Sequence, residues 1–258
     1  MKIVFGIFLI TLSFAVNATE SISLSSSGTL GLPKKIIGLY LREQIIDASA
    51  FPERIIGQLA SGCTATLIGP RHIITAGHCV YDVNKAEWLN DLRFFPARTS
   101  QTEKPYVIEW SKVFVQQKFI ETGYKSLDFA VIELALPIGD SLGWSGFRVL
   151  PESDYYNHIK ITGYPADKDL GTMWTVSCPG TVENKKLIYQ CDTFGGMSGS
   201  AIFSLPFDRT NPVLSGVHTW GIGKVNGGVF LDQNNFDLVY SWKNKTEQSP
   251  ATVIHIKP

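Results

Sequence analysis

The sequence lacks any concentration of charge of one sign. Its 258 residues include 23 Lys and Arg and 23 Asp and Glu, so the formal net charge is zero, and no run rich in Lys and Arg occurs. Binding to a nucleic-acid backbone needs concentrated positive charge. We therefore expect no nucleic-acid partner.

Beyond its N-terminus, the sequence also lacks an apolar stretch long enough to span a bilayer. Lys2 precedes an almost wholly apolar run over residues 3–16, and Ala18 ends a group of small residues suited to signal peptidase. This run is short for a membrane anchor, so we predict a signal peptide over residues 1–18. The mature protein is expected to be secreted or periplasmic, with no membrane contact.

Cysteine is scarce, and no Cys-x-x-Cys pair occurs, which argues against a four-cysteine zinc site. An even number of cysteines in an exported chain predicts two disulfides. Three connectivities are open, and proximity in the sequence favours Cys63–Cys79 and Cys178–Cys191.

Helical periodicity is rare, and there is no internal repeat. Short β-type runs separated by Gly, Pro, Asn and Asp occur instead at residues 65–68, 72–75, 129–132 and 160–163. This pattern predicts an all-β sandwich or barrel. One amphipathic helix is expected over about residues 234–245, with an apolar face of Phe236, Val239, Tyr240 and Trp242.

The predicted boundaries divide the chain into four parts. After the signal peptide, residues 19–35 have the composition of a short propeptide that ends in two lysines. Residues 36–248 form the expected β domain, and residues 249–258 a C-terminal tail.

Three segments carry candidate chemistry: residues 75–79 contain His78, residues 128–134 begin with Asp128, and residues 195–200 contain Ser198. Alone, each is ordinary, because single histidines usually pack, aspartates begin turns and glycine-rich loops are common. Together they have the chain order of chymotrypsin-like enzymes rather than that of subtilisins or α/β-hydrolases. A lipase or esterase is therefore disfavoured.

These residue types suit acyl transfer. A serine hydroxyl needs a base that titrates near neutrality, which is the range of histidine. The histidine in turn needs a carboxylate to set its tautomer. Ser198 is thus the predicted nucleophile, His78 the base and Asp128 the orienting group. The N–H groups of Gly196 and Ser198 are the predicted oxyanion hole. The reaction on protein or peptide substrates needs no cofactor, and no metal-site spacing is present.

The segments Thr75-Ala76-Gly77-His78-Cys79 and Gly196-Met197-Ser198-Gly199-Ser200 resemble trypsin-like peptidases. Other segments resemble the glutamyl endopeptidases of staphylococci and bacilli, namely residues 62–64, 68–70, 163–168, 171–174, 189–193, 217–219 and 226–230. The resemblance spans roughly residues 36–245. It implies two six-stranded antiparallel β-barrels with the active site between them, and we expect a monomer.

Two features of the sequence bear on activation, and the first is a departure from digestive trypsins. Met197 stands where those enzymes have an Asp that pairs with the new N-terminus, and glutamyl endopeptidases also lack that Asp. Both Lys35-Ile36-Ile37-Gly38 and Arg54-Ile55-Ile56-Gly57 resemble activation sequences. The second lies too close to Cys63 to leave room for an opening strand, so maturation is expected near residues 34–36.

The resemblance places His218 and Thr193 where a pocket holds the substrate carboxylate, helped by the mature N-terminal amine. Cleavage after Glu is therefore expected, with Asp slower. Asp192 supports the alternative of Arg or Lys preference, and His218 as a purely structural residue is a further alternative.

The family pattern also places Thr219 beside Asp128, and Trp220 and Gly221 at the strand edge that pairs with extended substrate. A non-catalytic binding module on the same fold is the rival function; it is disfavoured because all three triad residues are present.

Overall fold

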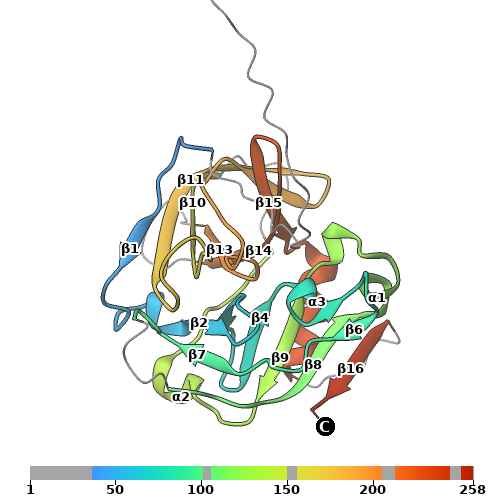
Figure 1. Cartoon of the computed structure of the whole chain (residues 1–258). Coiled ribbons are helices and arrows are strands. Elements are labelled where there is room, and N and C mark those ends of the chain that lie inside the picture. Colours follow the sequence, from blue (N-terminus) through green and yellow to red (C-terminus); the bar gives the residue numbers. More distant parts are fainter. Residues whose placement is uncertain (1–36, 101–105, 150–155, 205–212, 245–250, 258) are drawn as a thin grey trace, which may run out of the picture. The chain divides into compact units, whose positions relative to one another are not determined.

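The computed structural model of the chain describes residues 37–100, 106–149, 156–204, 213–244 and 251–257. The predicted signal peptide and propeptide lie outside the described residues. The described part is built mainly from two antiparallel sheets of seven strands each (Figure 1). An all-β fold with a C-terminal helix is thus confirmed.

The C-terminal sheet closes into a barrel. Its order is β11-β10-β13-β14-β15-β12, and β12 pairs back to β11, so six strands form a ring; β1 adds to the free edge of β11. The strands of this sheet are β1 (Glu43–Ile45), β10 (Tyr156–Gly163), β11 (Met173–Glu183), β12 (Lys186–Tyr189), β13 (Ala201–Ser204), β14 (Val213–Ile222) and β15 (Val225–Phe230).

The N-terminal sheet has the order β16-β8-β9-β4-β3-β2-β7. Its strands are β2 (Ile56–Leu59), β3 (Thr64–Leu67), β4 (His72–Thr75), β7 (Phe94–Pro96), β8 (Trp110–Gln116), β9 (Ala130–Leu134) and β16 (Thr252–Ile256). A bridge between Phe94 of β7 and Ile108, just before β8, links the two ends of the six strands from β8 to β7. One barrel is therefore closed by a full strand pair, the other by a single bridge.

The four β-type runs expected from the sequence lie within or next to β3, β4, β9 and β10. All residues of β4 and β9 are buried, because these central strands have neighbours on both sides and core on one face. Ile73 of β4 pairs with Ile132 of β9, and both are fully buried. β-Branched side chains suit such pleated, packed positions.

The helices are α1 (Gln117–Thr122), α2 (Gly139–Leu142) and α3 (Gln233–Asn244), with 3₁₀ turns η1 (Glu53–Ile55), η2 (Gly77–Cys79) and η3 (Lys125–Leu127). The Asp232 carboxylate caps α3 by accepting the Asn235 N–H at 2.8 Å. Val239 and Trp242 are buried as expected, but Tyr240 is 52 % exposed. Tyr240 follows Val239 by one residue, which turns it about 100° away from the buried face.

The residues expected to form a C-terminal tail include an integral strand. β16 pairs with β8 from Thr252–Gln116 to Ile256–Lys112, and Figure 1 shows the two strands side by side. The His255 ring stacks on Trp88 at 4.3 Å between centroids and on Trp110 at 5.7 Å. Trp88 belongs to the small hairpin of β5 (Tyr81–Asp82) and β6 (Glu87–Trp88). β16 therefore covers an edge of β8 that would otherwise be open to pairing with other chains.

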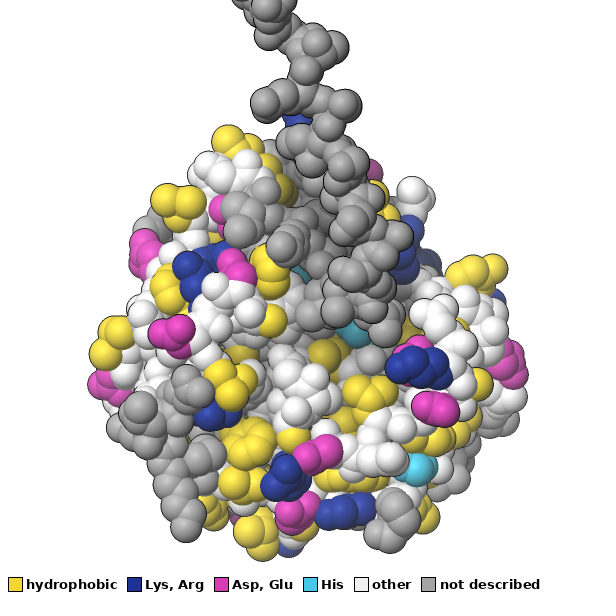
Figure 2. Space-filling view, in the orientation of Figure 1, with side chains coloured by type: hydrophobic (Ala, Val, Ile, Leu, Met, Phe, Trp, Pro, Cys, Tyr) yellow, Lys and Arg dark blue, Asp and Glu magenta, His cyan; other side chains and the backbone are white. Residues whose placement is uncertain are grey.

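Within the described residues, no helix is long and apolar enough to cross a membrane. Figure 2 shows basic side chains next to acidic ones on the face in view, as the balanced composition implies.

His255→Ala should lower the free energy of unfolding by about 1–2 kcal/mol, because two ring contacts disappear. Urea unfolding of both proteins in a Ser198→Ala background would measure the change without self-digestion. Lys85→Ala is the control: it removes an ion pair with Asp82 in which the lysine side chain is 58 % exposed, so its effect should stay below about 0.5 kcal/mol. A His255→Ala protein as stable as this control would contradict the structural role of β16.

Candidate active site

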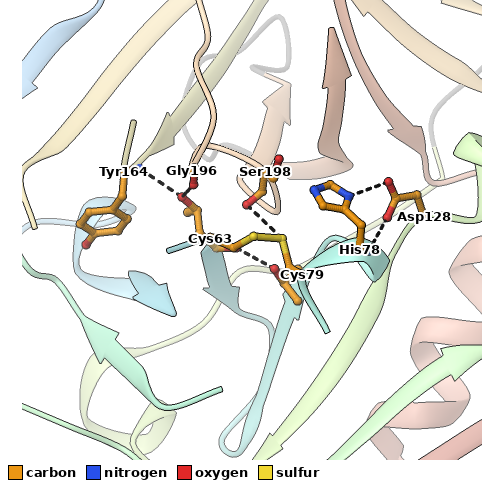
Figure 3. The surroundings of a disulfide bond; sticks show 9 residues. Cys63, His78, Cys79, Asp128, Tyr164, Gly196 and Ser198 are labelled. Atoms are coloured by element: carbon orange, nitrogen blue, oxygen red, sulfur yellow. Dashed lines mark hydrogen bonds and ion pairs between the residues drawn. A yellow bond between two sulfur atoms is a disulfide. The ribbon is translucent and has the colours of Figure 1, made fainter. Parts of the chain in front are cut away.

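His78 and Asp128 come together from two turns of the N-terminal sheet. His78 lies in η2, directly after β4, and Asp128 follows η3 at the start of the segment leading into β9. One Asp128 oxygen is 2.8 Å from His78 Nδ1, and the other accepts the His78 backbone N–H at 2.8 Å. The single carboxylate thus sets both the ring and the main chain of the histidine (Figure 3).

Two opposing effects act on the pKa of His78. Partial burial disfavours the charged imidazolium and lowers the pKa, whereas the Asp128 charge and hydrogen bond raise it; the net result is a raised pKa. The ring is still 39 % exposed, so its other nitrogen is accessible. Figure 3 shows Ser198 on the side of the ring opposite Asp128.

Ser198 lies in a loop of the C-terminal barrel that is tied to strand β3 of the other sheet. The Thr64 N–H donates to the Ser198 carbonyl at 2.8 Å, and the Thr64 hydroxyl donates to the Gly196 carbonyl at 2.9 Å. Within its own barrel, the Gly199 N–H donates to the His218 carbonyl at 2.7 Å. The loop is therefore held by hydrogen bonds on both sides.

Gly196 needs to be glycine for two reasons. Its φ is +96°, and a Cβ atom there would lie 2.3 Å from the Tyr164 carbonyl oxygen. Among the described residues, the N–H groups of Gly196 and Ser198 have no hydrogen-bond acceptor. These two donors are thus available for a ligand oxygen beside the Ser198 side chain.

Both favoured disulfides are present, Cys63–Cys79 and Cys178–Cys191. The first lies against the site, because Cys79 follows His78 and its sulfur is 3.8 Å from the Ser198 carbonyl oxygen. In the described ranges, Cys63, His78 and Cys79 also make the only group of three potential metal-ligating side chains close together. Disulfide sulfurs are not thiolates, so this group does not have the donor set of a metal site.

His218, on β14, is buried beside the Ser198 loop with 4 % exposure. Its N–H donates to the Ser200 carbonyl at 2.9 Å. Its ring Nδ1 lies 2.6 Å from the Tyr189 hydroxyl and 3.1 Å from the Gly227 carbonyl oxygen. Burial lowers the pKa of His218 to about 4, so the ring is neutral at neutral pH.

Thr193 and Asp192 are both buried, each with 2 % exposure. One Asp192 carboxylate oxygen accepts the N–H groups of Ile37 at 2.6 Å and Gly38 at 2.8 Å. The carboxylate expected to attract Arg or Lys is therefore already bonded to the first described residues of the chain. Sequence spacing gives no signal for this contact, because the partners lie 155 and 154 residues apart.

Thr219, Trp220 and Gly221 lie consecutively on β14. The Thr219 hydroxyl is buried and has no hydrogen-bond partner within the described ranges, so the structure does not join it to Asp128. The Lys125 ammonium, from η3, lies 5.1 Å from the centre of the Trp220 ring. Met197 is completely buried in the barrel core, as expected of an apolar residue.

Two site residues were not anticipated from the sequence. Thr64 holds the Ser198 loop, and Tyr189 contacts His218. Thr64 and Tyr189 lie in the segments 62–64 and 189–193 that carry the resemblance, but the sequence assigned neither residue a role, and only the folded structure shows their partners.

Comparison with known proteins identifies the family. The trypsin family profile matches residues 47–237. A glutamyl endopeptidase of Bacillus licheniformis is 35 % identical over 83 % of this chain and 71 % of its own length. A Bacillus subtilis protein named extracellular metalloprotease is 31 % identical over the same shares.

Among solved structures, a Glu endopeptidase in complex with MPD has a TM-score of 0.73 and 29 % identity, covering 81 % of this chain and 99 % of the other. A protease from Arthrobacter nicotinovorans, at 16 % identity and a TM-score of 0.60, shares the fold. With its order of His, Asp and Ser and its two-sheet fold, the chain belongs to the trypsin-like serine peptidases and is a serine-type endopeptidase.

Proposed function

We propose that this peptidase cuts after Glu, and more slowly after Asp, with Ser198 as nucleophile, His78 as base and Asp128 as orienting group. The single observation that carries the catalytic part is the double contact of Asp128 with His78, both at 2.8 Å, on the side of the ring away from Ser198. The substrates are proteins or peptides, and the enzyme acts as a monomer.

The proposed reaction begins when the Ser198 oxygen attacks the carbonyl carbon of the peptide bond. The hydroxyl proton passes to His78 Nε2, and the carbonyl oxygen becomes an oxyanion. As the carbon–nitrogen bond breaks, His78 gives that proton to the leaving amine, and an ester with Ser198 remains. Water then attacks the ester by the same proton path, which releases the acid and restores Ser198.

The oxyanion would be bound by the N–H groups of Gly196 and Ser198. Thr64 supports this role, because it bonds to the carbonyl of each donor residue, in the peptide units 196–197 and 198–199, and so restrains the backbone of Gly196 and Ser198. Such preorganised donors need no rearrangement when charge develops, and each typically lowers the activation barrier by about 2.7–4 kcal/mol.

The preference for Glu is supported by the chemistry of the groups around the pocket. Asp192 is occupied by two backbone N–H groups, so it is poorly placed to bind a substrate cation. His218 and Thr193 carry groups that donate to a carboxylate. Two of the proteins to which the chain is similar are named for activity after Glu.

We also propose export and maturation near residues 34–36. A cut there leaves a chain whose first residues lead directly into Ile37 and Gly38, which Asp192 holds next to Thr193. The new amine would then add a positive charge near the pocket, which favours a substrate carboxylate.

The pH dependence of kcat/KM tests the His78–Asp128 pair. Only neutral His78 accepts the serine proton, and its pKa is raised, so activity should rise with pH through a midpoint above the usual histidine value of about 6.5. Asp128→Asn should move that midpoint to lower pH and reduce kcat by about 10⁴-fold. An unchanged profile in the variant would contradict the assignment.

Gly196→Ala should lower kcat at least about 100-fold, because the added Cβ meets a backbone oxygen and forces the donor N–H away. Gly223→Ala is the matched control: this glycine also has a positive φ, of +60°, but no atom lies within 4 Å of its added Cβ. Chromogenic peptide hydrolysis would compare the two. Equal losses would point to general strain rather than to the oxyanion hole.

Specificity is tested with four peptides that differ only in Glu, Asp, Arg or Phe before the scissile bond. The matured protein should cut the Glu peptide fastest, His218→Ala should lose that preference about tenfold or more, and Ser198→Ala should be inactive. Faster cleavage after Arg would keep the triad but assign specificity to Asp192. No cleavage of any peptide would favour a binding module.

A further inference from the structure

The Tyr189 hydroxyl makes a buried contact that the proposed mechanism does not use. Tyr189 on β12 and His218 on β14 are 3 % and 4 % exposed, and the hydroxyl oxygen lies 2.6 Å from His218 Nδ1. The Gly227 carbonyl, on β15, lies 3.1 Å from the same nitrogen. Within the described residues, both hydrogen-bond contacts of the ring are thus on Nδ1, and Nε2 is left for a ligand.

A neutral imidazole carries a single ring N–H. The two contacts of Nδ1 favour different positions for that hydrogen. A carbonyl oxygen only accepts, and Gly227 therefore favours the tautomer with hydrogen on Nδ1. A tyrosine hydroxyl can donate as well as accept. If it donates, Nδ1 is the acceptor and the hydrogen must lie on Nε2.

The tautomer decides what His218 presents to a substrate. With hydrogen on Nδ1, Nε2 offers a lone pair, which repels a carboxylate. With hydrogen on Nε2, the neutral ring donates a hydrogen bond to that carboxylate. Second contacts of this kind commonly set the tautomer of functional histidines.

We propose that Tyr189 is a positioning residue for specificity: it donates its O–H to His218 Nδ1 and so directs the Nε2–H toward an acidic side chain of the substrate. This inference rests on the proposed preference for Glu. It explains how a buried, uncharged histidine recognises an anion.

The groups around His218 keep its ring uncharged, so the tautomer decides whether Nε2 donates a hydrogen bond. His78 lowers and Asp128 raises its pKa, with burial the largest effect and the Gly227 contact opposing it. Asp192 is already bonded to Ile37 and Gly38. Burial raises the pKa of Tyr189 well above its usual value, so the phenol keeps the proton that it donates.

The tautomer can be measured directly. Ring nitrogen-15 shifts distinguish hydrogen on Nδ1 from hydrogen on Nε2, and the Ser198→Ala protein avoids self-digestion during the experiment. We expect hydrogen on Nε2 of His218 in that protein and on Nδ1 when Tyr189→Phe is added, because Gly227 is then the remaining partner. The same tautomer in both proteins would overturn the proposal.

Kinetics supply the second test. At pH 8, Tyr189→Phe should raise KM for a Glu peptide about tenfold, the value of one buried hydrogen bond, with kcat unchanged. KM for the matched Gln peptide, whose amide can donate to a lone pair, should change much less.

Tyr81→Phe is the control, since it removes a hydroxyl from a buried tyrosine, 7 % exposed, in the other half of the chain. Equal losses with Glu and Gln peptides would overturn the role of Tyr189. If the enzyme without substitutions does not prefer Glu over Gln, the proposed function is contradicted. The nitrogen-15 shifts would still test whether Tyr189 sets the tautomer of His218.

Discussion

The active site depends on one threonine that belongs to neither the triad nor the pocket. Thr64 donates its N–H to the Ser198 carbonyl and its hydroxyl to the Gly196 carbonyl, and the same hydroxyl accepts the Tyr164 N–H at 3.1 Å. Its own carbonyl accepts the Thr75 hydroxyl at 2.7 Å. Because Thr75 ends the strand that leads to His78, Thr64 holds the Ser198 loop and the His78 turn in fixed positions relative to each other. Buried hydrogen bonds of this kind fix the positions of the groups that they join, because leaving a buried polar group unpaired costs free energy.

Two histidines in neighbouring positions have opposite electrostatic characters. Both lose solvation through burial, which disfavours their charged forms. His78 has a carboxylate on its ring and becomes more basic, whereas the hydrogen-bond partners of the His218 ring among the described residues are a phenol and a carbonyl, and burial makes His218 less basic. The first is thereby suited to accept protons, and the second to remain neutral while donating a hydrogen bond. The difference lies in their partners rather than in the residue type.

Much of the fold and of the candidate triad could be predicted from the sequence, because both depend on local signals. Alternating β-branched runs marked β3, β4, β9 and β10, and the segments around His78 and Ser198 carry residue types that acyl transfer requires. The contacts of Asp192 with Ile37, and of Tyr189 with His218, could not be predicted. They join segments far apart in the chain, and backbone N–H groups leave no trace in the residue type. The strand β16 was missed for a related reason. The sequence of its five residues does not show which strand edge they pair with.

The place of β16 has a consequence for the order of events during synthesis. Val253 pairs with Val115, so the final strand of the N-terminal sheet comes from a segment that follows the whole C-terminal barrel in the sequence. That sheet cannot be completed until the C-terminal barrel has been synthesised, because residues 252–256 follow all the strands of that barrel in the sequence. The turns that bring His78 to Asp128 belong to this late-finished half. The sheet that carries His78 and Asp128 is therefore completed only after the barrel that carries Ser198 has been synthesised, so the two halves of the candidate site come together late, which would limit premature cleavage of the producing cell's own proteins.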